Sequence, residues 1–374
     1  MENNNLNSEE SFKKNVTLTK SMKKRYLGIL VILVVVIILA NLSYFNNWGG
    51  DIKIGAVLPL SGYAEFMGTE MQRGMEMCNP GNIKYIYEDS VGSATTGVSA
   101  YSKLTQIDNV DVVVVGMSTV VPAILPIAKE NKDFVIATIV TAAEVGKKGG
   151  DTVFRYYLDG YGVGQIIADS MVKLDAKKIG IMYVQNEFGI TYKDGAQDFL
   201  DERGVSVYSE SFQATETDFS TQLLKLKQNK VDFILVIAYD KQTLQVISKI
   251  KELDLEASIF SAWMWQDSDF ENNKDILSDT YNTRSSYMFG LNKDAVKFNE
   301  DFKTKFGSNP SQFSAIGCDL SLLIGKNNLN TPEKLNALKV LNGINGEIEQ
   351  GQYGELNFPV KVIQFVEDEV IIIE

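Results

Sequence analysis

Two hydroxyl side chains follow two consecutive apolar runs of the sequence, and hydroxyls in such an arrangement can bind an anion. Ser118 comes shortly after the run Val110–Val115, and Thr141 follows the next run, Phe134–Thr138. Continuous β-branched runs are typical of strands that are buried on both faces. Residues 120–131 between them have the character of a helix, whose N-terminus would add free N–H groups and a partial positive charge. The pattern predicts a binding site for an anion such as a carboxylate.

The elements around these hydroxyls support the same interpretation. Two strands joined by a helix are expected to lie parallel, and ligands of open α/β sheets sit at the C-terminal ends of the strands. Each residue also has an ordinary alternative, with Ser118 as a helix N-cap and Thr141 as a turn residue. Similar chemistry after consecutive strands favours the ligand site.

The composition narrows the classes of protein to which the chain can belong. Its 374 residues are 45% hydrophobic and 22% charged, which indicates a globular protein of about two domains. The net charge of −12 argues against nucleic-acid binding, which needs clustered Lys and Arg. The sequence has no histidine, so Ser-His-Asp and Cys-His catalysis and the commonest metal ligand are excluded.

Motifs for catalysis or for a cofactor are also missing from the sequence. It shows no nucleophile–base pair, no P-loop and no metal-ligand cluster, and Gly162-Val163-Gly164 lacks the third glycine of a dinucleotide fingerprint. We therefore expect a protein that is not an enzyme and needs no cofactor. Cys78 and Cys318 are either a long-range disulfide or two buried thiols.

Residues 26–45 form an uncharged apolar segment, directly preceded by Lys23-Lys24-Arg25. A segment of about 20 residues can cross a hydrocarbon core of about 30 Å, and the basic cluster places its N-terminal side in the cytoplasm. A cleavable signal peptide is the alternative, but residues 41–45 fit a cleavage site poorly. We expect a cytoplasmic tail (1–25), a single-pass signal-anchor in the cell membrane (26–45) and an extracytoplasmic binding domain.

From residue 52 onward, predicted strands alternate with predicted helices in two series of similar length. Such alternation is typical of parallel sheets covered by helices, and two similar lobes would share a cleft at their strand ends. The second series begins with a turn at 159–162 and a helix over 166–174. A strand is expected at 282–289, then three helices, and strands and turns from Gly346.

Short motifs along the chain resemble those of a known family. They include Ile54–Gly62 (IGAVLPLSG), Gly116-Met117-Ser118, Thr141–Glu144, Asp218-Phe219-Ser220 and the G-x-x-G-x-x-x-F stretch Gly351–Phe358. In this order, over residues 52–374, the chain resembles the periplasmic binding protein type I family, specifically its leucine/isoleucine/valine-binding branch. Members of that branch feed branched-chain amino-acid ABC importers.

The resemblance implies a fold and a partner. We expect two doubly wound parallel-sheet lobes joined by three crossovers, which close like a hinge around a ligand. Lobe 1 would comprise 51–158 plus 285–345, and lobe 2 would comprise 159–284 plus 346–374. An ABC permease is the expected membrane partner, and a small molecule such as an amino acid or another small carboxylate is the expected ligand.

The resemblance also implies the ligand-binding residues. Ser118 and Thr141 would hold the carboxylate, and the carbonyl of Ile139 would accept from an ammonium group. The aromatic residues that line the relatives' cleft fall here on three positions: Met67, Phe188 and Tyr239.

One position departs from the family pattern. Amino-acid binders carry an acidic residue after the strand that ends at Ala262, but here Met264 takes that place, between Trp263 and Trp265. An ammonium buried without a carboxylate is costly. One possibility is that the ligand has no ammonium group. The two tryptophans would then either face an apolar acid or pack in the core. The other possibility is that the ammonium pairs with a different acidic residue: Glu65, Asp159, Asp240 or Asp267.

Together these features predict a membrane-anchored extracytoplasmic solute-binding protein that delivers a small carboxylate to an ABC importer. The alternative is a ligand-sensing receptor ectodomain of the same fold that acts through a membrane partner.

Overall fold

The structure is a computed structural model, and it describes residues 51–141, 144–262, 270, 272–290, 292–338, 341–366 and 369–373. No helix within these ranges has the length and apolar character needed to cross a bilayer. The predicted signal-anchor, residues 26–45, lies outside the described residues.

The first of two sheets contains the runs that the sequence marked as strands. The β-branched run at β3 is buried along its whole length, as expected for a strand covered on both faces. The strand order is β11-β12-β13-β5-β4-β3-β1-β2. The strands are β1 (Ile52–Leu58), β2 (Ile83–Asp89), β3 (Val112–Gly116), β4 (Val135–Thr138), β5 (Val153–Tyr156), β11 (Leu341–Gly343), β12 (Gly346–Gln350) and β13 (Glu355–Asn357).

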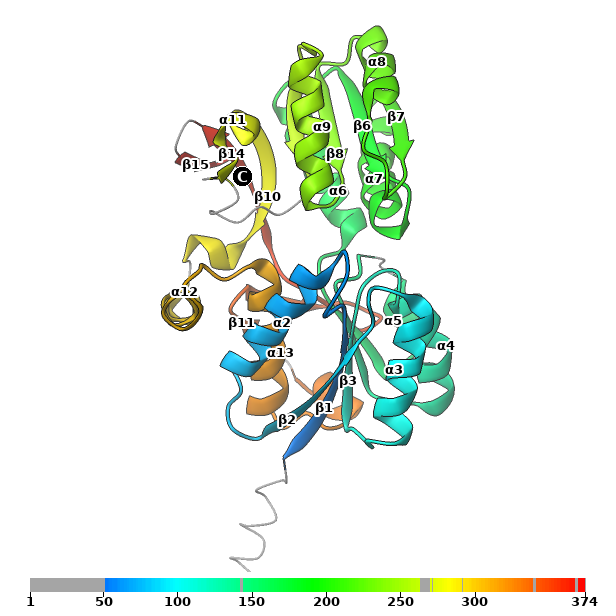
Figure 1. Ribbon diagram of the computed structural model, residues 1–374, viewed down its shortest axis with the longest axis vertical. Helices are drawn as coiled ribbons and strands as arrows, with labels where there is room; N and C mark the ends of the chain where they lie inside the picture. The colour runs from blue at the N-terminus through cyan, green and yellow to red at the C-terminus, as the bar shows by residue number, and fades with distance from the viewer. Residues whose placement is uncertain are drawn as a thin grey trace, which may run out of the picture. The chain divides into compact units, whose positions relative to one another are not determined.

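Helices cover both faces of this first sheet (Figure 1), with α2 and α13 on one face and α3 and α4 on the other. Glycines let α2 and α13 approach closely, since a Cβ at Gly74 would meet the carbonyl of Ser314. The helices are α2 (Glu65–Met77), α3 (Ala94–Gln106), α4 (Val121–Asn131), α5 (Val145–Gly149), α12 (Lys293–Phe306), α13 (Gln312–Lys326) and α14 (Pro332–Asn336).

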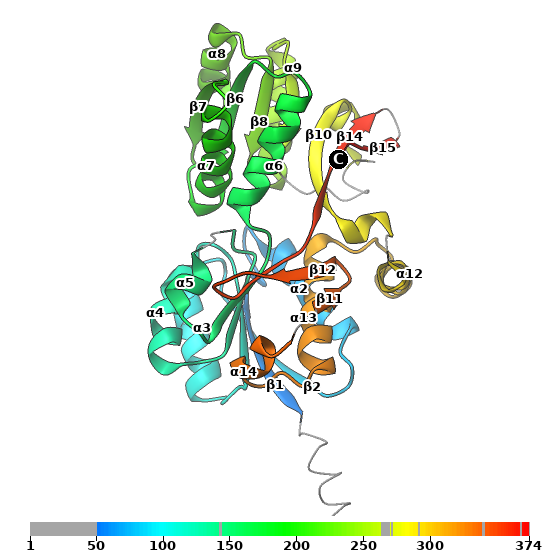
Figure 2. The ribbon, with the colours of Figure 1, turned by 180° about the vertical axis from the view of Figure 1, so that it is seen from behind.

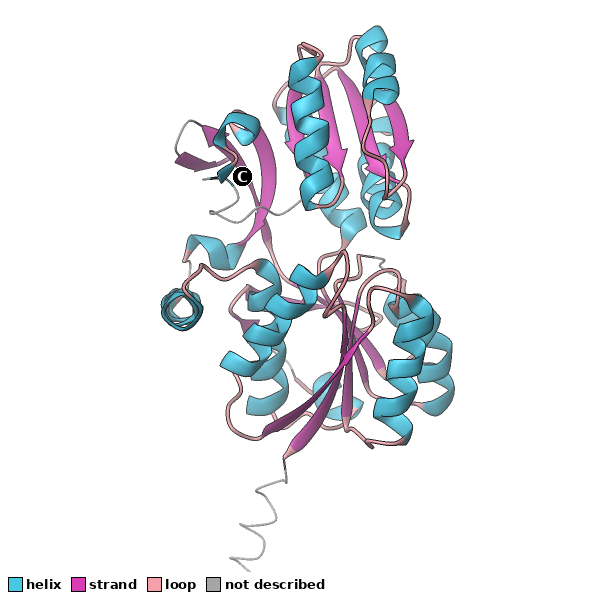
Figure 3. Ribbon diagram, in the orientation of Figure 1, coloured by secondary structure: helices cyan, strands magenta, loops and turns pink. Residues whose placement is uncertain are grey.

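The second sheet repeats the arrangement. Its strand order is β15-β14-β10-β9-β8-β6-β7, with β6 (Lys178–Val184), β7 (Ser206–Phe212), β8 (Phe233–Ile237), β9 (Ser258–Ser261), β10 (Thr280–Ser285), β14 (Val360–Val366) and β15 (Glu369–Ile372). Around it lie α6 (Gly160–Lys173), α7 (Glu187–Asp201), α8 (Ser220–Asn229), α9 (Asp240–Glu252), α11 (Lys274–Leu277) and the 3-10 helix η1 (Ser286–Phe289). Figure 3 shows both sheets between their helices.

The two sheets therefore confirm two α/β lobes, but they correct the expectation that the sheets are purely parallel. Six strands of the first sheet run parallel, in the order β2-β1-β3-β4-β5-β13, and five of the second, in the order β7-β6-β8-β9-β10. Antiparallel strands extend each sheet at one edge, with β12 against β13 in the first and β14 against β10 in the second. The strands β12 and β13 form a hairpin, which pairs antiparallel, whereas β14 comes long after β10 in the chain and runs back along it after the last crossing between the sheets.

A second correction concerns residues 346–357, which the prediction placed in lobe 2. Figure 2 shows β12 crossing beside β11, and β13 pairs parallel with β5 through Glu355 and Leu356. Both β12 and β13 therefore belong to the first sheet, and the chain crosses to the second sheet only at 358–359, before β14. The other two crossings follow β5 and β10. The predicted strand 282–289 also ends earlier, at Ser285, and η1 begins at the next residue, Ser286.

Cys78 and Cys318 form a disulfide, which decides between the two alternatives left by the sequence. Their Cα atoms are 5.0 Å apart, although 240 residues separate them along the chain. The bond joins the end of α2 to the middle of α13, so it ties together two helices on the same face of the first sheet.

Candidate functional site

The strands β3 and β4 are each followed by a residue with a left-handed backbone. Met117 has φ 91° and Ile139 has φ 50°. A positive φ is unfavourable for non-glycine residues, most of all for a β-branched one such as Ile139. Strained backbone of this kind gathers at ligand sites, where the surrounding structure holds it in place. Because β3 and β4 are parallel neighbours, the two turns lie at the same edge of the sheet.

Ser118 lies between the turn at Met117 and helix α4. The N-cap of α4 is Val120, without a side-chain cap hydrogen bond, so Ser118 does not have the ordinary capping role. The hydroxyl of the next residue, Thr119, donates to the carbonyl of Gly92 at 2.9 Å, so it is already used within the protein. The free N–H groups expected at this helix N-terminus are not found, because the N–H groups of Val121 and Ala123 donate to backbone carbonyls and Pro122 has no N–H. The hydroxyl of Ser118 is therefore the donor that this turn can offer to an anion.

Thr141 follows β4 and is almost fully buried, with 2% of its surface exposed. Its carbonyl accepts a hydrogen bond from the Gly160 N–H at 3.1 Å. Its hydroxyl, in contrast, has no hydrogen-bond partner among the described residues. A buried hydroxyl without a partner costs about 1–3 kcal/mol. A ligand oxygen bound at this hydroxyl would remove that cost.

The second lobe contributes the aromatic rings of Phe188 and Tyr239, which lie close to the side chain of Asn186. Asn186 is the N-cap of α7, where its oxygen accepts from the Gly189 N–H at 3.1 Å. The amide nitrogen of Asn186 donates to the Tyr239 hydroxyl, also at 3.1 Å. The Phe188 ring stacks on Tyr239 with centroids 5.1 Å apart and an angle of 23° between the planes. On another side it meets Tyr192 at 60°, with centroids also 5.1 Å apart.

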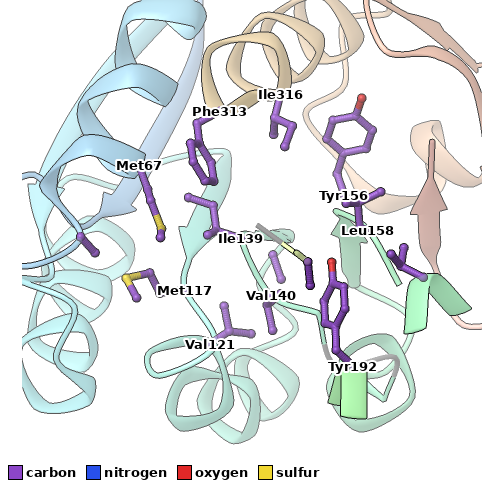
Figure 4. Packing of buried hydrophobic residues seen from close by; sticks show 14 of the residues in the cluster. Met67, Met117, Val121, Ile139, Val140, Tyr156, Leu158, Tyr192, Phe313 and Ile316 are labelled. Carbon is purple, nitrogen blue, oxygen red and sulfur yellow. The ribbon is translucent and has the colours of Figure 1, made fainter. Parts of the chain in front are cut away.

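These side chains of the two lobes line one cavity of about 30 Å³. Figure 4 shows Met67, Met117 and Ile139 next to one another on the first lobe. Ligand pockets commonly have volumes of about 300 Å³ or more, so side chains fill most of this site in the arrangement described. The cavity is lined by Met67, Met117, Ser118, Ile139, Thr141, Tyr157, Phe188 and Tyr239.

Six of the eight residues named from the sequence thus come together in one cavity. The other two, Trp263 and Met264, lie outside the described residues. Sequence reasoning missed Met117 and Tyr157. Tyr157 follows the end of β5, the next strand after β4, so the rule that pointed to Ser118 and Thr141 would have identified it if extended by one strand. That the cavity residues bind a ligand stays a prediction.

The described lining residues are uncharged at neutral pH. Burial raises the pKa of Tyr239 to about 12, against the opposing effect of the Asn186 amide, which donates to the phenol oxygen. Burial also raises the pKa of Tyr157 above its usual range. Both phenols therefore keep their protons, and an anion at Ser118 and Thr141 would meet hydroxyl donors without a repelling charge.

Of the four acids considered as partners for an ammonium, two are described and neither lines the cavity. Glu65 is exposed at the start of α2. Asp159 is the N-cap of α6, where its carboxylate accepts from the Tyr161 N–H at 3.2 Å. The side chain of Asp240 and all of Asp267 lie outside the described part of the structure. No cluster of acidic or cysteine ligands that could hold a metal ion occurs within the described ranges.

Comparisons with known proteins agree with the fold. A model of the family described as "Periplasmic binding protein" matches residues 51–327. Leu/Ile/Val-binding protein homolog 3 of Brucella melitensis is 23% identical over 54% of this chain and 58% of its own length.

Two solved structures show the same architecture. A leucine-binding protein of Thermotoga maritima superposes with a TM-score of 0.77 at 20% identity, over 86% of this chain and 98% of that one. A solute-binding protein of an R. palustris ABC transporter, in complex with benzoate, reaches 0.77 at 18% identity, over 87% and 96%.

Proposed function

Because the chain belongs to the periplasmic binding protein family, as a type I member similar to leucine/isoleucine/valine-binding proteins, we propose that it binds a small carboxylate and delivers it to an ABC importer. The observation that carries the proposal is the buried Thr141 hydroxyl, without a described partner, in the same cavity as Ser118. A carboxylate at this place would accept a hydrogen bond from each of the two hydroxyls.

The small volume of the cavity fits a protein that opens and closes. At about 30 Å³ the site does not admit a ligand as it stands. One wall comes from the first lobe, and Phe188 and Tyr239 come from the second. The connections at 157–160, 286–290 and 358–359 are the segments where a hinge motion would occur.

The location of the protein is part of the proposal. The binding domain would lie outside the cytoplasm, held at the membrane by residues 26–45, with a permease as its partner. The Cys78–Cys318 disulfide supports an oxidising compartment, since such bonds persist outside the reducing cytosol.

The test is a pair of single-hydroxyl variants in the full chain. Ser118→Ala and Thr141→Val each remove one donor to the carboxylate, and a hydrogen bond to a charged group contributes about 1.5–3 kcal/mol. We expect each variant to raise the Kd of an identified acid by about tenfold or more, measured by calorimetry.

Thr138→Val is the matched control. Thr138 is also fully buried with a hydroxyl that has no described partner, but it does not line the cavity. Its replacement should leave the Kd unchanged. Equal affinities in Thr141→Val, Ser118→Ala and the control would overturn the proposed site.

A further inference from the structure

The cavity has two apolar walls of different shape. The wall of the first lobe is built from the flexible thioethers of Met67 and Met117 and from Ile139. The opposite wall is the stacked pair of Phe188 and Tyr239, whose planes are only 23° apart.

The stacked pair is held in place from two sides. Tyr192, which is buried, meets the Phe188 ring at 60°, and Asn186 holds the Tyr239 hydroxyl. The second lobe therefore presents two aromatic rings in a fixed orientation, while methionines adapt to whatever lies against them and make favourable sulfur–aromatic contacts. When the lobes part, the space between fixed aromatic rings and adaptable methionines suits an aromatic ring.

The charges of the cavity lining are a second feature that bears on the ligand. None of the described lining residues carries a carboxylate that could pair with an ammonium group. Burial of an ammonium without such a partner costs several kcal/mol, whereas a carboxylate finds donors at Ser118 and Thr141. An acid without an α-ammonium therefore fits this lining better than the corresponding amino acid.

We infer that the ligand is an aromatic carboxylate without an α-ammonium group, with its ring between the methionines and the Phe188–Tyr239 pair. This inference rests on the proposed function, because it assumes that Ser118 and Thr141 hold the carboxylate.

The experiment measures the affinity of the full chain for matched ligands by calorimetry and thermal shift. Hydrocinnamate and L-phenylalanine differ only in the ammonium group, as do isocaproate and L-leucine, and hydrocinnamamide keeps the ring without the acid. We expect hydrocinnamate to bind at least about tenfold more tightly than each of the other four, since buried ring contacts and the lost ammonium cost each contribute more than about 1.4 kcal/mol.

Each other outcome has a definite meaning. If L-phenylalanine or L-leucine binds as tightly as its analogue without the ammonium, the inference is overturned and the proposed function stands. Equal binding of isocaproate and hydrocinnamate overturns the aromatic part of the inference. If the amide binds as well as the acid, or if no acid binds, the proposed function itself fails.

A pair of variants tests the aromatic wall directly. Phe188→Leu removes the ring of the wall, while Phe199→Leu removes a ring of similar burial in the same helix, where it packs on Arg203 outside the cavity. We expect Phe188→Leu to lower the preference for hydrocinnamate over isocaproate by about tenfold, and Phe199→Leu to leave it unchanged. An unchanged preference in both variants would show that the ring does not lie on Phe188.

Discussion

Tyr239 combines three constraints in a single side chain. Its ring stacks on Phe188, its hydroxyl accepts from Asn186, and burial raises its pKa to about 12. An ordinary tyrosine has a pKa near 10, so the folded state binds this proton more tightly than the unfolded state does. The stabilisation is therefore complete below about pH 10 and is lost as the pH rises toward 12.

The raised pKa of Tyr239 leads to a prediction for unfolding at alkaline pH. In Tyr239→Phe the phenol is gone, so the urea midpoint should fall less steeply between about pH 10 and 12 than it does in the unmodified protein. Tyr353→Phe is the control, because Tyr353 is 47% exposed and its removal should leave the slope unchanged. An identical slope in Tyr239→Phe would contradict the burial argument.

At the scale of elements, the start of helix α6 fixes the position of Thr141. The sequence suggested a turn at 159–162 and a helix only over 166–174, but α6 begins at Gly160 directly after its N-cap, Asp159. The Gly160 N–H donates to the Thr141 carbonyl, so the helix and the turn after β4 hold each other. Because of this close approach, a Cβ at Gly160 would lie 2.7 Å from the Thr141 Cβ and 2.9 Å from the Tyr192 ring.

Gly160→Ala should therefore harm both stability and binding. The extra methyl group must displace Thr141 or Tyr192, and overpacking of this kind commonly costs about 1–3 kcal/mol. We expect a lower melting temperature and an affinity for the acid reduced by about tenfold or more.

Gly162→Ala is the control in the same turn of the helix. Its nearest neighbour would be the flexible Asp159 carboxylate at 3.0 Å, and alanine favours a helix over glycine by about 1 kcal/mol. This variant should keep its affinity, and its melting temperature should stay the same or rise. Loss of binding in both variants alike would mean that Gly160 has no specific role.

At the scale of the whole molecule, the disulfide closes a loop that contains the five parallel strands of the second lobe, β6 to β10. The chain leaves the first sheet after β5, builds β6–β10 and returns, and only then forms α13 with Cys318. The bond thus fixes two helices of the first lobe whatever the second lobe does. Cys78 lies eleven positions after Met67 in the chain, about 16 Å away along α2 by helix rise.

Removal of the bond should therefore lower stability without changing binding. We expect Cys78→Ser/Cys318→Ser to lose about 2–5 kcal/mol in the free energy of unfolding, by urea titration, and to keep its ligand affinity. Reductant should lower the melting temperature of the unmodified protein and leave that of the double variant unchanged. A melting temperature of the unmodified protein that does not respond to reductant would contradict this role.

The sequence alone determined the features that depend on neighbours along the chain. Apolar runs such as Val112–Gly116 specify buried strands, and the hydroxyls after two of them marked the edge where the cavity lies. The tertiary structure decided what depends on residues far apart. It placed Phe188 and Tyr239 against the first lobe, joined Cys78 to Cys318 and added β13 to β5, since such contacts arise from long-range packing that local patterns do not encode.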